Sequence, residues 1–407
     1  MHTARAALHR WRRVSSEPDT PRPDELPPRS VALRELAALF LRLGTTAFGG
    51  PAVHIAMMED EVVRRRKWMT HEAFLDLYGA TNLIPGPNST EMAIHIGHRR
   101  AGFAGLVVAG ASFILPAALI TGAMAWAYVR FGALPQATAV MYGIKPVIIA
   151  VVIQALAAFA RTALKKRAMI AIAVAAVIAT FSGVNELVIL LGAGAITAAL
   201  RNLDRPASPA PPSTRAALPL LAGTALAGGA AAPFGLAPLF LFFLKVGAVL
   251  FGSGYVLLAF LRADLVERFH WLTETQLLDA VAIGQFTPGP LFTTATFIGY
   301  VLGGAAGAAV ATVGIFLPAF VFVAVSGPLV PKLRRSPLAG AFLDGVNAAS
   351  LALMAAVTWQ LGRSSIVDVP TALLAVVGAA VLLRYRPSSV WLVLGGGLAG
   401  IVIRGLR

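Results

Sequence analysis

Residues 40–50 read FLRLGTTAFGG, and residues 243–254 read FLKVGAVLFGSG. Further along, residues 75–87 read LDLYGATNLIPGP, and residues 278–290 read LDAVAIGQFTPGP. Both pairs match at one ungapped offset (247 − 44 = 203), and the match continues after a one-residue deletion. A long, weak internal repeat in a very apolar chain is typical of a membrane protein of the transporter class, built by duplication.

The composition places most of this chain in a lipid bilayer. Hydrophobic residues make up 57% of its 407 residues and charged residues 13%, against about 25% charged in a soluble domain. Mean hydropathy is +0.75. The net charge of +15 does not indicate a nucleic-acid partner, because Lys and Arg gather in short segments between apolar runs, as orientation signals do. The chain has no cysteine, which excludes disulfides and thiolate metal sites.

Changes in composition divide the chain into four parts. Residues 1–30 are Arg-rich and then Pro-rich and acidic, which predicts a disordered cytosolic tail. Residues 31–200 form the first repeat and residues 238–407 the second. Between them, residues 201–237 contain a Pro/Ser-rich linker followed by one extra apolar span.

Two kinds of apolar segment alternate along the chain. Nine unbroken runs each have about the length needed to cross a bilayer; they occupy roughly residues 103–129, 137–160, 168–183, 185–200, 216–232, 305–330, 338–361, 367–383 and 389–403. Four others are interrupted by Gly or Pro, at 31–58, 71–97, 238–260 and 275–300. Lipid cannot replace the backbone hydrogen bonds that these residues break, so the four segments are predicted to be broken or re-entrant helices inside the protein.

The fold class that follows is an all-α polytopic membrane protein with nine full spans and four broken segments, or thirteen spans if all cross. The basic cluster at 64–67 favours the re-entrant alternative, which keeps it on the cytosolic side with residues 98–100. In the first repeat a strong basic cluster, 161–167, follows the second unbroken run, whereas in the second repeat residues 332–335 follow the first. This shift of one span predicts that the repeats have inverted topology.

The two Pro-Gly-Pro elements, 85–87 and 288–290, are the best candidates for a substrate site. A half-helix that begins inside the membrane points unpaired N–H groups and a positive dipole end into the protein, which suits an oxyanion. The polar residues that follow are expected to cap these helices and to add donors; they are Asn88, Ser89 and Thr90 in the first repeat and Thr293 and Thr294 in the second.

Arg42 and Lys245 are a second candidate because they occupy equivalent positions in apolar stretches. A cation at membrane depth usually faces a cavity or a partner. The alternatives are snorkelling to the interface or pairing with a carboxylate such as Glu91. Lys145 is a further buried cation, and Asn82 and Gln285 form an equivalent amide pair three residues before each Pro-Gly-Pro.

Three titratable residues, His54, His95 and Glu91, are candidate proton carriers, since such a group in a membrane cavity can act as a relay. The acidic run 59–61 is expected to be a solvated amphipathic face. The sequence contains no nucleophile arrangement, metal cluster or cofactor-binding loop, which argues against an enzyme and predicts neither a metal nor a cofactor. A GxGxxG-like match at 395–400 lies in an apolar run and is interpreted as a packing motif.

The FGG(P) and PGP breaks, the W-x-T segments after Lys67 and His270, and the late G-x-x-P and G-V-N-A-A elements together resemble the chromate ion transporter family in its long, two-domain form. The resemblance extends from about residue 32 to the C-terminus. The family's motif positions fall on Phe48, Gly49, Gly50, Pro51, Trp68, Pro85, Gly86, Pro87, Phe251, Gly252, Trp271, Pro288, Gly289 and Pro290. The second repeat has Ser253-Gly254 where the first has Gly50-Pro51, so the halves have diverged.

The resemblance implies a multi-pass protein of the bacterial inner membrane that exports chromate, driven by the proton motive force, and confers chromate resistance. Sulfate stays open as the cargo, because both are tetrahedral dianions of similar size. A membrane enzyme or scaffold is the third alternative. The expected partners are the dianion, the lipid bilayer and a second copy of the chain in a homodimer.

Overall fold

The computed structural model describes residues 28–48, 50–203, 233–251, 256–326, 336–385 and 389–405. Within these ranges every regular element is a helix and none is a strand. The first repeat contains α2 (Arg29–Thr46), α3 (Pro51–Glu59), the π-helical turn η2 (Asp60–Arg65), α4 (His71–Thr81), α5 (Asn88–Phe131), α6 (Pro135–Ala163), α7 (Arg167–Phe181) and α8 (Glu186–Leu203).

The second repeat has the same order of elements. It contains α9 (Leu236–Val249), α10 (Leu257–Phe260), the π-helical η4 (Leu261–Arg268), α11 (Glu274–Phe286), the 3₁₀ turn η5 (Leu291–Thr293), α12 (Thr294–Ser326), α14 (Pro337–Ser365), α15 (Val369–Tyr385) and α16 (Ser389–Gly405). Eight of the nine predicted spans coincide with described helices. The ninth, 216–232, the linker 204–215 and most of the N-terminal tail lie outside the described residues.

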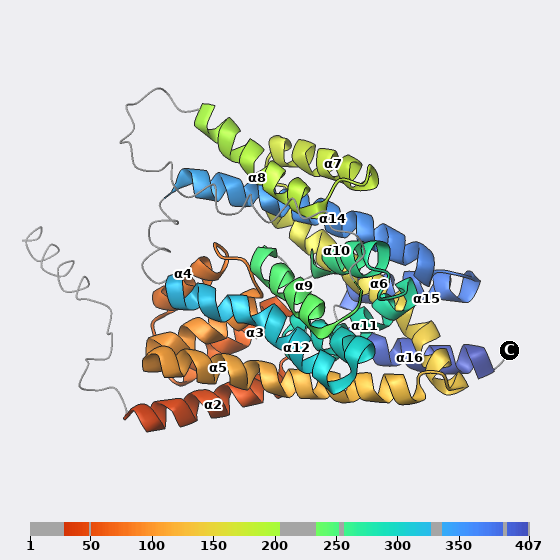
Figure 1. Ribbon diagram of the computed structural model, residues 1–407, viewed down its shortest axis with the longest axis horizontal. Helices are drawn as coiled ribbons and strands as arrows, with labels where there is room; N and C mark the ends of the chain where they lie inside the picture. Colours follow the sequence, from red (N-terminus) through yellow and green to blue (C-terminus); the bar gives the residue numbers. More distant parts are fainter. Residues whose placement is uncertain are drawn as a thin grey trace, which may run out of the picture.

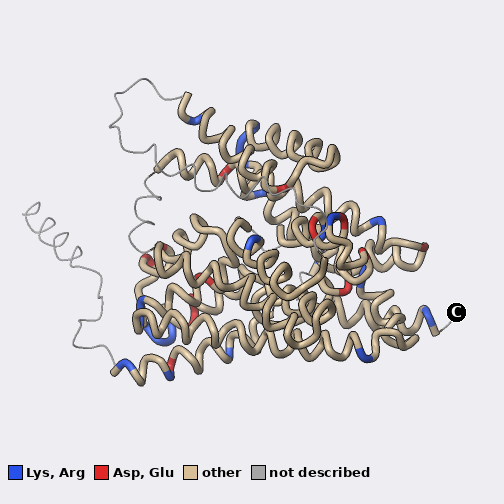
Figure 2. Tube along the Cα trace, in the orientation of Figure 1, with Lys and Arg blue, Asp and Glu red and all other residues tan. Residues whose placement is uncertain are grey.

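Five stretches of the described chain are long and apolar enough to cross a membrane: α5, α6, α8, residues 291–326 and α14. Four shorter apolar helices, α7, α9, α15 and α16, accompany them. Figure 2 shows these helices as mostly uncharged along their middle lengths. The prediction of an all-α polytopic membrane protein is confirmed.

All four predicted breaks are helix boundaries in the structure. The first repeat breaks between α2 and α3 and between α4 and α5; the second breaks between α9 and α10 and between α11 and η5. The threonine of each W-x-T segment starts the helix that follows: Thr70 Oγ1 accepts from the N–H of Ala73, and Thr273 forms a capping box with Gln276.

Two sharp reversals follow the Pro-Gly-Pro breaks. Helix α5 turns back at Ala101–Gly102 and α12 at Gly303–Gly304, where Gly102 and Gly304 have φ of 61° and 59°. Each helix therefore has a short proximal limb, 88–100 or 294–302, folded against a long distal limb. Contact is close, since a Cβ on Gly97 would lie 2.2 Å from the Gly105 carbonyl oxygen. Glycine at these positions lets two backbones touch.

The broken segments are re-entrant hairpins. Arg100, at the end of the proximal limb of α5, pairs with Glu35 near the start of α2 and lies over the ring of Trp68, 4.0 Å from its centroid. The starts and ends of both hairpins of the first repeat therefore lie at one end of the molecule. In the second repeat Phe234 and Trp271 pack at 5.5 Å, and Gly303 lies against Phe234.

Equivalent helices run in opposite directions. In Figure 1 the colours show the distal limbs of α5 and α12 running antiparallel to each other, and likewise α6 and α14. The repeats also exchange their last two helices: α15 and α16 pack on α6, whereas α7 and α8 pack on α14. At the crossings a Cβ on Gly143 would lie 2.0 Å from Gly396 O, and one on Gly345 2.4 Å from Ala193 O. The glycine run 395–400 is thus a packing motif, as interpreted from the sequence.

The main hydrophobic core lies at the boundary between the repeats and includes side chains of α6, α8, α9, α11, α12 and α14. A smaller cluster holds the hairpins of the first repeat together, with Phe40, Met58 and Phe113 fully buried in it.

We expect cysteines introduced into loops 161–167 and 332–335 to be labelled from the cytosol only. Helix α6 ends and α14 begins at the same end of the molecule in Figure 1, although residues 332–335 themselves lie outside the described residues. The chain has no native cysteine, so labelling of intact and lysed cells with an impermeant maleimide gives a direct reading. A cysteine in the 132–134 loop, at the other end of α6, is the matched external control. Opposite accessibility of the two basic loops would disprove the orientation.

Candidate functional site

The helix breaks of the two repeats meet at the boundary between them. The N–H of Gly86 donates a hydrogen bond to the carbonyl of Leu250 at 2.8 Å, and the N–H of Gly289 donates to the carbonyl of Ala47 at 2.9 Å. These two bonds are equivalent under the repeat offset (289 − 86 = 250 − 47 = 203). Each Pro-Gly-Pro tip is therefore held by the first break of the other repeat, so protein satisfies backbone that lipid could not.

Only glycine fits the centre of either tip. Gly86 has φ of 141° and Gly289 of 86°, a region that side chains disfavour. A Cβ on Gly86 would stand 2.4 Å from Glu91 Oε1, and one on Gly289 would stand 2.6 Å from the Cβ of Ala117. Helices begin directly after each tip, so the unpaired N–H groups and positive dipole ends of α5 and η5 are at the boundary between the repeats.

The hydroxyl side chains after the second tip are turned to their own backbone, whereas in the first repeat Thr90 Oγ1 has no hydrogen-bond partner among the described residues. Thr293 Oγ1 donates to Pro290 O at 2.9 Å and receives a long bond from Thr121 at 3.4 Å. Among the described residues no side chain caps α5 or η5, whose N-cap positions are Pro87 and Pro290. The expectation that the polar side chains cap these helices is therefore wrong. The N-cap residue is a proline, whose side chain has no oxygen to accept from the backbone N–H groups, and the Thr293 hydroxyl donates to a carbonyl of the tip instead.

The three candidate proton carriers are all buried, Glu91 and His95 on α5 and His54 on α3. Glu91 is 0% exposed and neither carboxyl oxygen has a hydrogen-bond partner among the described residues. His54 Nε2 lies 3.0 Å from Ala47 O, the carbonyl that also accepts from Gly289, while its Nδ1 has no partner in the described part of the chain. His95 Nε2 is likewise unpartnered there. Glu91 therefore lies against the first tip at Gly86, and His54 contacts the carbonyl of the break that holds the second tip.

The cations at equivalent positions are both paired, but not with Glu91. Arg42 Nη2 lies 2.6 Å from Glu61 Oε1, and Lys245 Nζ pairs with Asp264. Glu61 and Asp264 are themselves equivalent under the repeat offset (264 − 61 = 203). The acidic run 59–61 is thus not wholly a solvated face, since Glu61 is 7% exposed. Helix α3 and η2 turn back beside α2 and bring this carboxylate to Arg42.

A cavity of about 630 Å³ lies between α2 and the returning α3–η2 segment. Its wall includes Arg42, Glu61 and Arg65, and the guanidinium of Arg65 lies 3.6 Å from the Glu61 carboxylate. Arg66 approaches the other carboxyl oxygen at 3.2 Å. The side chains of Arg42 and Arg65 are 50% and 65% exposed, against 9% for Glu61, so the cations border the open space and the carboxylate lies behind them.

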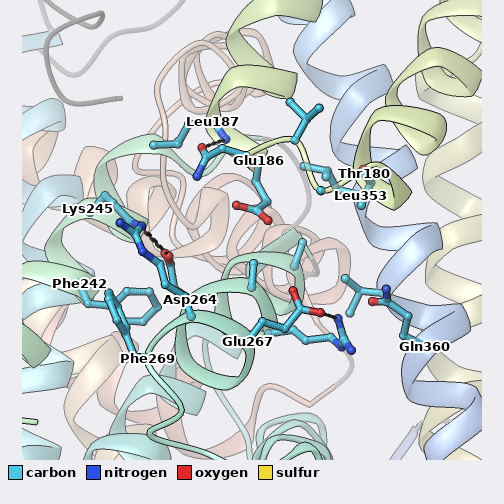
Figure 3. A pocket seen from close by; sticks show the side chains of 18 of the residues that line it. Thr180, Glu186, Leu187, Phe242, Lys245, Asp264, Glu267, Phe269, Leu353 and Gln360 are labelled. Atoms are coloured by element: carbon cyan, nitrogen blue, oxygen red, sulfur yellow. Dashed lines mark hydrogen bonds and ion pairs between the residues drawn. The ribbon is translucent and has the colours of Figure 1, made fainter. Parts of the chain in front are cut away.

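The second repeat has an equivalent and larger cavity of about 950 Å³. Lys245, Asp264 and Arg268 line it, and Arg268 Nη1 lies 3.5 Å from the Asp264 carboxylate. In Figure 3 Lys245 and Asp264 are joined on one side, and Glu186 points into the same space from α8. This cavity is larger because the turn between α7 and α8, together with α14, adds walls to it.

Lys145 also has a partner. Its Nζ lies 2.9 Å from Asp279 Oδ1, and the hydroxyl of Tyr128 donates to the other carboxyl oxygen at 2.8 Å. Asp279 is 3% exposed and stands on α11, whereas its partners stand on α5 and α6. This ion pair therefore joins the first repeat to the second. In the second repeat the position equivalent to Lys145 is the neutral Asn347, so the second repeat cannot form the same ion pair.

The structure brings together some of the predicted residues and separates others. Both tips, 85–87 and 288–290, contact the other repeat, and Ser89, Thr90 and Thr294 are buried behind them. Asn82 is exposed and accepts from Asn88 at 2.8 Å. The other predicted residues are Phe48, which is 37% exposed, Gly50 at the start of α3, Gln285 near the end of α11, and Gly49 and Gly252, which lie outside the described residues.

Four charged residues escaped the sequence reading: Glu61, Arg65, Asp264 and Arg268. The signal was present, because Arg65 and Arg268 share the repeat offset just as Glu61 and Asp264 do. At both of these positions the two repeats have a residue of the same charge, acidic at 61 and 264 and basic at 65 and 268. The neighbouring Asp60, by contrast, corresponds to Ala263.

Comparison with known proteins agrees with this architecture. A family model described as chromate transporter matches residues 34–198 and again residues 237–401. The chromate transport protein of Cupriavidus metallidurans is 35% identical over 382 residues, which cover 92% of this chain and 94% of that protein. The chromate transport protein of Pseudomonas aeruginosa is 33% identical, over 93% and 94%, and a probable chromate transport protein of Synechococcus elongatus is 31% identical, over 86% and 89%. No solved structure matches. The chain therefore belongs to the chromate transporter family.

Proposed function

We propose that this protein is a secondary active transporter that exports chromate across the bacterial inner membrane in exchange for protons and so confers chromate resistance. The observation that supports this most is the pair of crossed hydrogen bonds between the Pro-Gly-Pro tips and the breaks of the opposite repeat. They place two helix N-termini at the boundary between inverted repeats, where transporters bind substrate. An oxyanion there is stabilised by N–H groups and dipole ends without a full buried countercharge.

The charges along the two cavities support an anionic cargo. In each cavity two cations surround one carboxylate, so a dianion that displaces this carboxylate meets two positive charges. Chromate is the favoured substrate because curated relatives of nearly full coverage are named chromate transport proteins. Sulfate is the second candidate, because the same cations and N–H groups would bind any tetrahedral dianion of that size.

Proton coupling would use a buried carboxyl at the tips. Removing an ionised carboxylate from water without a partner costs on the order of several kcal/mol. Glu91 is wholly buried and unpartnered in the described structure, so ionising it would favour a conformation in which it reaches water. His54, bonded to the Ala47 carbonyl that also holds the second tip, is the second candidate carrier.

Transport in sealed vesicles tests the proposal. Inside-out vesicles from cells that produce the protein should accumulate labelled chromate when respiration energises them, and a protonophore should abolish the accumulation. The inhibition of chromate uptake by an excess of unlabelled sulfate measures the selectivity of the site between the two dianions. Absence of chromate uptake above that of empty vesicles, with the protein present in the membrane, would refute the function.

We expect Arg42→Gln and Lys245→Gln each to weaken chromate transport while the protein still inserts. Loss of one hydrogen bond to a charged group costs about 1.5–3 kcal/mol, which corresponds to roughly ten- to a hundredfold in affinity. The concentration dependence of vesicle uptake measures the loss as a raised KM. Arg34→Gln, an exposed change earlier on α2, is the control. Normal KM values in both variants would make the two cations interfacial anchors only.

A further inference from the structure

The two cavities contain the same three-residue arrangement, which we call the charge triads. The first triad is Arg42–Glu61–Arg65 and the second is Lys245–Asp264–Arg268. All three positions are related by the single offset of the repeat (245 − 42 = 264 − 61 = 268 − 65 = 203). Each triad has one carboxylate between two cations on separate elements. One cation stands on α2 or α9, and the other stands on the π-helical η2 or η4.

The environment of the triads has diverged while their charges have not. Asp60 beside the first triad corresponds to Ala263, and Arg66 corresponds to Phe269. Since partly exposed ion pairs contribute only about 0–1 kcal/mol to stability, fold stability alone does not account for the retention of both triads. Their cations border cavities of about 630 and 950 Å³, which is what a ligand site requires and a structural bridge does not.

The charged side chains that line each cavity balance one another. Asp60 pairs with Arg65 at 2.7 Å in the first cavity, and Arg262, Glu186 and Glu267 join the triad in lining the second. A dianion would therefore bind by displacing the triad carboxylate from its two cations. A tetrahedral oxyanion carrying two negative charges would neutralise both cations and offer each of them an oxygen, as bidentate and multi-donor anion recognition requires. The carboxylate lies on the buried side of the cations, with side-chain exposures of 9% and 4%.

We propose that each charge triad is an anion-access site for a tetrahedral dianion, and that Glu61 and Asp264 act as built-in competitors that hold the cations until the dianion displaces them. The inference rests on the proposed function and deepens it. Because the repeats are inverted (Figure 1), the first triad receives the dianion from one side of the membrane and the second from the other.

The test is dianion binding to the purified full-length protein and its variants. Equilibrium dissociation constants are measured with labelled sulfate and labelled chromate. Removing the competitor with Glu61→Gln or Asp264→Asn should tighten binding about tenfold. Glu59→Gln and Glu267→Gln remove the same charge from neighbouring residues that pair with Arg64 and Arg262 rather than with a triad cation, and they should change the constant less than twofold. Size-exclusion chromatography confirms that each variant is folded.

Sidedness adds a second reading that a general charge effect would not give. In oriented vesicles Glu61→Gln should lower the KM for flux from one side only, and Asp264→Asn for flux from the other. Should the amide variants fail to fold, Arg65→Gln and Arg268→Gln keep the main ion pair and should weaken binding about tenfold. Unchanged constants in the folded triad variants, or equal tightening in the controls, would overturn the proposal. Wild-type protein that binds the dianions as described but moves no chromate would instead refute the proposed function and leave the triads standing.

Discussion

Replacing Pro85-Gly86-Pro87 by three alanines should abolish the proposed chromate transport, and so should the same replacement at 288–290. Alanine favours a continuous helix through the tip, which would carry the N–H of Gly86 away from the carbonyl of Leu250, 2.8 Å from it now. The carbonyl left behind is buried and unsatisfied, at a cost of about 1–3 kcal/mol. The helix N-terminus proposed to bind the anion would also be lost, so the variant would lose both the anion site and the contact between the repeats.

Flux per inserted molecule in vesicles measures this effect. Ser89→Ala and Thr90→Ala are the controls, because they remove hydroxyls beside the tip without altering its backbone, and they should retain most of the transport. The single change Gly289→Ala should already be severe, since its Cβ would meet that of Ala117 at 2.6 Å. Triple-alanine variants that keep more than a tenth of wild-type flux would show that the helix breaks are not required for substrate binding and transport.

Changing Asp279 to Asn should lower the free energy of unfolding by about 3–5 kcal/mol, because it leaves Lys145 without its countercharge in a buried contact between the repeats. Reversible unfolding of the detergent-solubilised protein in increasing dodecyl sulfate measures the change. The double variant Asp279→Asn, Lys145→Met should recover most of the loss, since no uncompensated charge remains. Tyr128→Phe removes only one hydrogen bond to Asp279 and should cost about 1 kcal/mol.

A loss below 1 kcal/mol in Asp279→Asn, or no recovery in the double variant, would show that the ion pair does not join the repeats energetically.

The helix breaks were predictable because their causes are local. Gly and Pro prevent a continuous hydrogen-bond ladder wherever they stand, so FGGP and PGP locate the breaks without knowledge of any partner. The re-entrant path followed from charge, since the cluster at 64–67 had to stay with residues 98–100; the contact of Arg100 with Glu35 and Trp68 shows why both ends lie together. Local chemistry and charge thus predict the main features of the fold.

The partners of the buried cations were not predictable in the same way. Glu61 is 19 positions from Arg42 (61 − 42 = 19), and only the return of α3 beside α2 brings the two together. An acidic run next to a basic run reads as a solvated face, and nothing in a single copy separates Glu61 from Asp60. The pairing of Lys145 with Asp279 depends on packing between repeats, which no pattern within one repeat encodes.

The exchange of α7–α8 and α15–α16 between repeats has a consequence for biosynthesis. Helix α6 ends at Ala163, but α15, which covers part of it, begins only at Val369, 206 positions later (369 − 163 = 206). The face of α6 that carries Gly143 stays uncovered in the nascent chain until the last two helices leave the ribosome. Neither half can complete its fold alone, and a gene encoding one repeat would have to produce two copies that trade these helices.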